Sequence, residues 1–292
     1  MSNYSIKDLE TLSGVKAHTL RIWEQRYNIL TPNRTDTNIR LYTDEDVKRI
    51  LNVSLLNQHG HKISKISKLS LEEMNLEVLA LTQNSTKHPE QVHNLILCML
   101  DYDEVRFNHL FTRCVEQFGF EETMMRVVYP FLTKVGTLWQ TGAINPAQEH
   151  FISHLIVQKL ISEINNIKIG LQLNSKKCML YLAEDEHHEL SLLFSSFLFK
   201  SRGFHVLYLG QNLPFDDAVS AYNTFNPDIV FTVFTTANTN VNLQEYINKM
   251  SVNFEKSEIY ITGYRVVGND YEMPENTTLL TRIDQIFEIL EK

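Results

Sequence analysis

The sequence lacks most features of secreted, membrane and zinc-binding proteins. It has only three cysteines in 292 residues, Cys98, Cys114 and Cys178, and they are scattered in apolar surroundings. This odd number excludes a disulfide framework and a cysteine-rich zinc site. No apolar run approaches the roughly 20 residues of a membrane helix, and the start does not read as a signal peptide. We therefore expect a cytoplasmic protein with no membrane partner.

Phosphate-binding motifs are also missing, and the charge is unevenly distributed along the chain. No Gly-x-Gly-x-x-Gly and no Walker loop occurs, which gives no support to a dinucleotide or nucleoside triphosphate site. The net charge is −8, but residues 1–70 contain 11 Lys and Arg against 7 Asp and Glu. That segment is therefore +4 and the remainder −12. A cationic head on an acidic body predicts that only the head contacts nucleic acid.

Two short helices open the chain. Residues 5–9 begin the first, with Ser5 as its N-cap, and Ser13-Gly14-Val15 forms a turn. In the second, from residue 16 to 27, Leu20, Trp23 and Tyr27 share one apolar stripe and the basic residues lie off it. This pattern is typical of a helix-turn-helix, whose second helix enters the DNA major groove.

A short wing and a third helix follow. Residues 32–34 and 39–42 flank a polar tip and carry Arg34 and Arg40, and Thr43 caps a helix that runs to Gln58. The alternative is a solvated basic face on a small helical domain. The coincidence of cations, helix pair and wing favours DNA binding.

The head resembles the winged-helix domain of MerR-type transcription regulators. The resemblance lies in Tyr4-Ser-Ile-Lys-x-Leu, Ser13-Gly-Val, Thr19-Leu-Arg-x-Trp-Glu-x-Arg-Tyr and Arg40-Leu-Tyr-x-x-Glu-Asp-Val, and it covers nearly all of residues 3–70. It implies a homodimer on a pseudo-palindromic double-stranded DNA operator. The residues expected to contact DNA are Lys16, His18, Thr19, Arg21, Arg26, Arg34, Arg40 and Tyr42.

The middle of the chain predicts a four-helix bundle. After a winged domain over 1–72 and a linker over 73–89, helical patterns cover 90–101, 103–117, 120–138 and 146–165, within a domain over 90–170. Trp139 precedes the pair Glu149-His150 by ten residues, across a loop with Gly142 and Pro146. On the plainest interpretation Trp139 packs in the bundle and His150 caps or pairs nearby.

Trp-x9-Glu-His also resembles a cap motif in MerR-type regulators that carry adenosylcobalamin. In that family the Trp covers the upper face of the corrin, and the Glu and His contact the adenosyl group. The resemblance implies these roles for Trp139, Glu149 and His150. Light-sensing members generally have a His directly after the Trp, which takes over cobalt after photolysis. This chain has Gln140 there, which puts the usual light adduct in doubt.

The last part, 175–292, predicts a flavodoxin-like (Rossmann-type) parallel sheet. Strand candidates at 178–183, 204–209, 228–234, 258–262 and 278–281 alternate with helical candidates at 187–202, 214–224, 241–254 and 283–291. The fold class is thus multidomain, α plus α/β. Glu186 and His188 follow the first strand, where open α/β sheets bind ligands. A carboxylate that holds one ring nitrogen of a metal-binding His fits the same pair.

This half resembles cobalamin-binding domains of the methionine-synthase type, which carry Asp-x-His-x-x-Gly, Ser-x-Leu and Gly-Gly. The corresponding residues are Glu186-x-His188-x-x-Ser191, Thr232-Val233-Phe234 and Gly263-Tyr264. The resemblance implies His188 as the lower ligand of cobalt, oriented by Glu186. The tail of the nucleotide would run past Thr232, Gly263 and Tyr264. Ser191, Phe234 and Tyr264 depart from the family pattern, and Tyr264 replaces a glycine where the tail would pass close to the backbone.

Three hypotheses follow. The first is a DNA-binding regulator, not an enzyme, related to the light-responsive CarH/LitR-like repressors, whose dimer or tetramer assembly is controlled by adenosylcobalamin. The second is the same regulator with a degenerate sensor domain that needs no cobalamin. The third, a corrinoid methyltransferase carrier or mutase, leaves the DNA-binding head unexplained.

Overall fold

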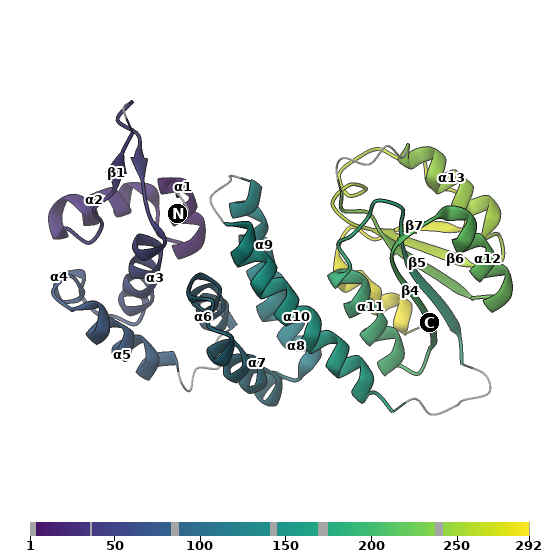
Figure 1. Ribbon diagram of the computed structural model, residues 1–292, viewed down its shortest axis with the longest axis horizontal. Coiled ribbons are helices and arrows are strands. Elements are labelled where there is room, and N and C mark those ends of the chain that lie inside the picture. The colour runs from purple at the N-terminus through teal and green to yellow at the C-terminus, as the bar shows by residue number, and fades with distance from the viewer. Residues whose placement is uncertain are drawn as a thin grey trace. The chain divides into compact units, whose positions relative to one another are not determined.

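The computed structural model describes residues 4–35, 37–82, 88–140, 145–168, 175–236 and 242–291. The chain divides into two units, Met1–Leu155 and Ile156–Lys292 (Figure 1). The first holds the winged head and most of the helical bundle, and the second holds the sheet. The domain borders predicted at residues 72, 90 and 175 are finer than this division and remain predictions.

The head has the predicted helix pair, wing and third helix. It contains helix α1 (Ile6–Ser13), helix α2 (Ala17–Tyr27), helix α3 (Asp44–Gln58) and a two-stranded antiparallel wing of β1 (Asn33–Arg34) and β2 (Arg40–Leu41). Capping boxes begin α1 at Ser5 and α3 at Thr43. They satisfy backbone N–H groups that a helix start leaves unpaired. Gly14 ends α1 with a positive φ of 72°, which glycine adopts without strain.

Two further helices follow where the sequence predicted the end of the head and a linker. Helix α4 (Ile63–Ile66) is one turn long, and α5 (Leu71–Thr82) covers residues 73–82 of the linker that we predicted over 73–89. Met74 and Val78, one turn apart, are buried, and Asn52 Nδ2 donates to Asn75 Oδ1 at 2.7 Å. This packing against α3 stabilises a segment whose polar residues suggested a linker. Residues 83–87 lie outside the described part.

The bundle has the four predicted helical segments. They are α6 (His88–Asp101), α7 (Glu104–Phe118), a third made of α8 (Phe120–Thr123), η1 (Met124–Val128) and α9 (Tyr129–Gln140), and α10 (Pro146–Asn166). The element η1 is a π-helical turn inside the third segment, and such turns often occur at functional sites. Helix α6 is buried along most of its length.

The second unit is a five-stranded parallel sheet with the order β4-β3-β5-β6-β7. Its strands are β3 (Lys177–Ala183), β4 (His205–Leu213), β5 (Ile229–Val233), β6 (Glu258–Thr262) and β7 (Thr277–Leu279). Its helices are α11 (Leu190–Ser201), α12 (Phe215–Phe225), α13 (Leu243–Asn253), η2 (Ile283–Gln285) and α14 (Ile286–Leu290). The flavodoxin-like prediction is confirmed.

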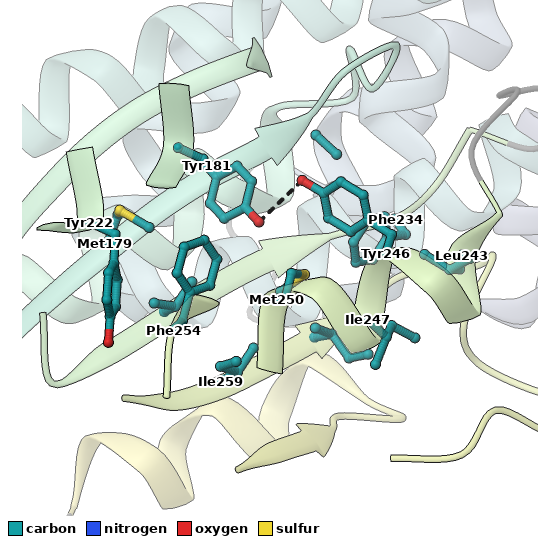
Figure 2. Packing of buried hydrophobic residues seen from close by; sticks show 14 of the residues in the cluster. Met179, Tyr181, Tyr222, Phe234, Leu243, Tyr246, Ile247, Met250, Phe254 and Ile259 are labelled. Carbon is teal, nitrogen blue, oxygen red and sulfur yellow. Dashed lines mark hydrogen bonds between the residues drawn. The ribbon is translucent and has the colours of Figure 1, made fainter. Parts of the chain in front are cut away.

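The sheet divides its side chains between two helical layers. Met179 and Tyr181 on β3 belong to a cluster with Tyr246 and Met250 of α13 (Figure 2). The Tyr246 hydroxyl donates to the Tyr181 hydroxyl at 3.2 Å, which satisfies a polar group inside this cluster. None of the described helices is both long enough and apolar enough to cross a membrane.

Candidate functional site

The carboxyl ends of β3 and β5 bring two loops together. β3 pairs with β4 on one side and β5 on the other, so the chain leaves β3 at a point where the strand order reverses. Such switch points are the usual ligand sites of open parallel sheets. Glu186 and His188 follow β3, and Thr235 and Thr236 follow β5.

Glu186 connects these two loops through its carboxylate, which is 4% exposed. The backbone N–H groups of Thr235 and Thr236 both donate to its Oε2 at 2.6 Å, and the Thr236 hydroxyl donates to Oε1 at 2.7 Å. Burial alone raises the pKa of Glu186, but its hydrogen bonds to His188, Thr236 and Thr235 lower that pKa to about 2. The carboxylate is therefore ionised at neutral pH.

Glu186 and Thr236 contact His188 at its Nδ1. Its Nδ1 lies 2.8 Å from Glu186 Oε1 and 3.2 Å from Thr236 Oγ1, while the side chain is 63% exposed. A ring fixed through Nδ1 presents Nε2 as the nitrogen for a metal. The sequence identified Glu186 and His188 but missed Thr235 and Thr236. Two adjacent hydroxyl residues at the end of a buried strand were the available signal.

The other residues expected around the nucleotide tail differ in their settings. Thr232 is fully buried, and its hydroxyl has no hydrogen-bond partner among the described residues. Ser191 lies in the first turn of α11, where its carbonyl accepts from the Ser195 hydroxyl at 2.8 Å. Phe234 packs in the core cluster beside α13. The Thr232 hydroxyl is thus a buried polar atom whose hydrogen-bonding capacity is unused by the described residues.

Gly263 and Tyr264 lie in the loop after β6. Gly263 has a φ of +115°, and a Cβ atom on it would lie 2.3 Å from the carbonyl oxygen of Phe234. Close backbone packing therefore requires glycine at this position. Tyr264 is 73% exposed, so its ring does not fill the interior of the sheet.

The helical candidates lie on or near α9 and α10. Trp139 and Gln140 end α9, but their side chains and Gly142 lie outside the described residues. Glu149 Oε2 lies 3.5 Å from His150 Nδ1, and the His150 side chain is 68% exposed. His154, which the sequence analysis did not single out, stacks on His150 with ring centroids 6.1 Å apart. The described residues contain no group of three or more ligands for a metal ion.

The second helix of the head presents a basic outer face. His18, Arg21 and Arg26 are exposed, whereas Thr19 is half-buried. The Lys16 side chain is 73% exposed and pairs with Glu10 at 3.0 Å. The three exposed side chains and Lys16 are thus accessible to a DNA groove and its phosphates.

The wing is attached to this helix through Glu24. Arg40 Nε donates to both Glu24 carboxylate oxygens at 3.1 Å, and the Tyr42 hydroxyl donates to Glu24 at 3.3 Å. Tyr42 is fully buried and was predicted to contact DNA, so its place in the structure corrects that expectation. Arg34 at the wing is exposed and donates to Asn38 at 2.6 Å.

Comparisons with known proteins match the winged head and the helical bundle to two family models. A family model described as MerR HTH family regulatory protein matches residues 4–73, and one described as B12 binding domain matches residues 91–161. The chain is 30% identical over 233 residues to the HTH-type transcriptional repressor CarH of Myxococcus xanthus, covering 78% of this chain and 77% of CarH. The chain belongs to the MerR-type regulators that carry a B12-binding domain.

Two further known proteins are similar to this chain. The HTH-type transcriptional repressor CarA of Myxococcus xanthus is 26% identical over 241 residues, covering 80% of this chain and 76% of CarA. The monomethylamine corrinoid protein of Methanosarcina barkeri has a TM-score of 0.54 at 13% identity, covering 70% of this chain and 99% of that one. At this identity the second similarity concerns the fold alone.

Proposed function

We propose that this MerR-type regulator is a transcriptional repressor whose assembly on DNA is controlled by cobalamin. The observation that carries the proposal is the Glu186–His188 pair at the switch point of the sheet, with the carboxylate buried and the imidazole exposed. The relatives CarH and CarA are named as repressors, and this supports repression as the output.

His188 is the proposed lower ligand of cobalt, and Glu186 and Thr236 orient its ring. The residues fit this role because a carboxylate bonded to Nδ1 fixes the tautomer with the proton on Nδ1 and leaves Nε2 as the donor to a metal. The buried hydroxyl of Thr232, together with Ser191, Gly263 and Tyr264, is the proposed lining for the nucleotide tail. When bound, the cofactor supplies a cobalt–carbon bond that light cleaves.

Trp139, Glu149 and His150 are the proposed contacts for the upper ligand. Adenosylcobalamin is the proposed form because the Trp-x9-Glu-His pattern resembles the adenosyl cap of the family. A ligand shifts an assembly only if it binds one state better than another. We therefore propose that the cofactor stabilises a dimer or tetramer, and that its photolysis releases DNA.

The DNA contacts are assigned to the outer face of α2 and to the wing. His18, Arg21 and Arg26 are the candidates for the groove and nearby phosphates, with Lys16 and Thr19 beside them. Arg34 and the outer guanidinium nitrogens of Arg40 would reach phosphates. Phosphate contacts give salt-dependent affinity, and base edges give specificity.

The experiment is a dark-versus-light comparison with adenosylcobalamin. The protein is purified in the dark with excess cofactor, and its visible spectrum, its size and its binding to an operator selected in vitro are recorded before and after illumination. We expect a coloured oligomer that binds DNA in the dark and a smaller species that releases it in light. A colourless protein after desalting would contradict the proposal.

The second candidate is a regulator of the same family that binds DNA without cobalamin. It is favoured by Glu186 itself, because the bonds from Thr235 and Thr236 would stabilise the loops even without a cofactor. It predicts equal binding to the operator with and without cobalamin, in dark and in light. A coloured protein with unchanged DNA binding in all four conditions would support cofactor binding without control.

A further inference from the structure

The end of the bundle that carries Glu149 and His150 also contacts the winged head. Lys134 of α9 donates from Nζ to the carbonyl oxygens of Leu12 at 2.9 Å and Thr11 at 3.3 Å. These carbonyls belong to the last turn of α1, where helical C=O groups have no intrahelical partner. A cation at this point also interacts favourably with the negative end of the helix dipole. Lys134 thus caps a helix of the head from outside it.

A second contact adjoins the candidate cap pair directly. Gln148, the residue before Glu149, is 3% exposed, and its Nε2 donates to Asp44 Oδ1 at 3.4 Å. Asp44 is the first residue of α3 and also accepts from the Tyr4 hydroxyl at 2.8 Å. The Gln148 Oε1 accepts from the backbone N–H of Asn145, the residue before α10. The same side chain therefore contacts both the start of this helix and the head.

A separate group of contacts connects the head to α6. Lys48 pairs with Asp101 at 2.6 Å, and His59 Nε2 lies 2.9 Å from Glu90 Oε1, where the carboxylate is 6% exposed. Lys48 and Asn52 lie along α3, and His59 directly follows it. These contacts involve α3 and the residue after it, whereas Lys134 contacts the end of α1 and Gln148 contacts the start of α3.

We propose that Lys134 and Gln148 are positioning residues that fix the orientation of the winged head on the bundle. The outer face of α2 stays exposed in this arrangement, so the contact positions the DNA-binding surface and does not cover it. Lys134 precedes Trp139 on α9, and Gln148 directly precedes Glu149 on α10.

The test measures the distance between the head and the bundle directly. Spin labels are attached to Lys7→Cys on α1 and Val105→Cys on α7, both exposed positions, and distances are recorded by pulsed electron paramagnetic resonance. The native Cys98, Cys114 and Cys178 are buried, and burial raises the pKa of each thiol, which keeps them unreactive. We expect one narrow distribution in the wild type and a clearly broader one in K134M/Q148L.

Two controls separate orientation from general damage. The matched variant K65M/Q58L makes the same chemical changes at exposed positions of the head and should keep the narrow distribution. K134R retains donors for the carbonyls of α1 and should also show the narrow distribution. If K134M/Q148L unfolds, Q148E places a second carboxylate beside Asp44, keeps Lys134, and should still broaden the distribution. Unchanged widths in a folded K134M/Q148L or Q148E protein would overturn the inference.

The consequence for DNA rests on the proposed function. If two heads read one palindrome, fixed orientation raises the effective concentration of the second head. K134M/Q148L should then lose roughly tenfold in affinity for a full palindrome selected in vitro but keep its affinity for a half-site. Failure of the wild type to select any operator would count against the proposed function, whereas the distance result would still decide the inference.

Discussion

The carboxylate of Glu186 lies 2.8 Å from Nδ1 of His188, and the two side chains differ sharply in exposure, at 4% and 63%. The acceptor is buried in the junction of two loops, and the imidazole projects from it. This is the arrangement of a metal-binding histidine whose orientation is set by a carboxylate. Glu186 also connects to the loop after β5, because the backbone N–H groups of Thr235 and Thr236 donate to its carboxylate.

Replacing Glu186 with Gln should weaken cobalamin binding by about 10- to 100-fold, the usual effect of losing the partner that orients a metal ligand. The amide has an acceptor oxygen at only one of the two positions, so it cannot accept both from the Thr235 and Thr236 N–H groups and from His188 Nδ1. Absorbance titration with hydroxocobalamin measures the affinity. His187→Ala, at an exposed neighbouring position, is the matched control and should bind as the wild type does. Equal affinity of E186Q and H187A would count against the assigned role.

Substitution should be costly at Gly263 and nearly neutral at Tyr264. Gly263→Ala forces a Cβ to within 2.3 Å of the Phe234 carbonyl at a positive φ, and should cost about 2–4 kcal/mol of unfolding free energy. Tyr264→Gly removes an exposed ring and should leave cobalamin affinity unchanged within about twofold. Urea denaturation and the same titration measure these effects. A large gain in affinity for Y264G would mean that the ring obstructs the cofactor.

Glu24 should be as important to DNA binding as the residues that we propose to contact DNA. Glu24→Ala leaves Arg40 and the buried Tyr42 hydroxyl without their acceptor, which costs about 1–3 kcal/mol. The wing would lose its attachment to α2, so affinity should fall for all DNA sequences alike. Arg21→Ala, by contrast, should spare stability and reduce affinity. Fluorescence anisotropy on the selected operator and on random DNA, together with thermal melts, distinguishes the two variants; identical stability losses would contradict this division.

His93 should make the first unit sensitive to mild acid. Burial, with a smaller effect of Arg106 and Lys134, lowers the pKa of His93 to about 3, whereas an unfolded histidine has a pKa near 6.5. The unfolded state therefore binds more protons below pH 6.5, and stability present above that pH is lost as the pH falls toward 3. At pH 5 the loss should be about 2 kcal/mol.

The variant His93→Gln keeps a side-chain N–H for Asn52, whose Oδ1 lies 3.4 Å from His93 Nε2. It should remove about 2 kcal/mol of the change in unfolding free energy between pH 7.5 and pH 5. Chemical denaturation at both pH values gives the comparison. An equal pH dependence in wild type and H93Q would show that other groups dominate this range.

Local sequence patterns were sufficient to predict most elements and the fold class. Alternating apolar runs placed all five strands of the sheet, and capping residues such as Thr43 placed helix starts, because both signals act over a few residues. Helix α5 was missed because the polar residues around it suggested a linker, and only its packing on α3 stabilises it. Propensity is a weak guide where tertiary contacts decide.

The candidate site was predicted only where one motif contained its residues. Glu186 and His188 are two positions apart, so their pairing is visible in the sequence. Thr236 is 48 residues away from His188, and only the parallel pairing of β3 with β5 brings it within 3.2 Å of the ring. Tyr42 occupies a motif position but is buried. The prediction for it was wrong because a motif does not distinguish a residue that contacts DNA from one that supports the wing.

The central claim is that His188 is the lower ligand of a bound cobalamin. The most direct test is electron paramagnetic resonance of the cob(II)alamin form, made with protein whose histidines carry 15N. Coupling to a 15N nucleus splits the cobalt lines into doublets, whereas a 14N ligand gives triplets. We expect doublets in the labelled wild type and triplets in the unlabelled protein. In H188A the splitting that comes from the histidine nitrogen should be lost. Triplets in the 15N-histidine protein would contradict it, because the cofactor's own nucleotide base would then be the ligand.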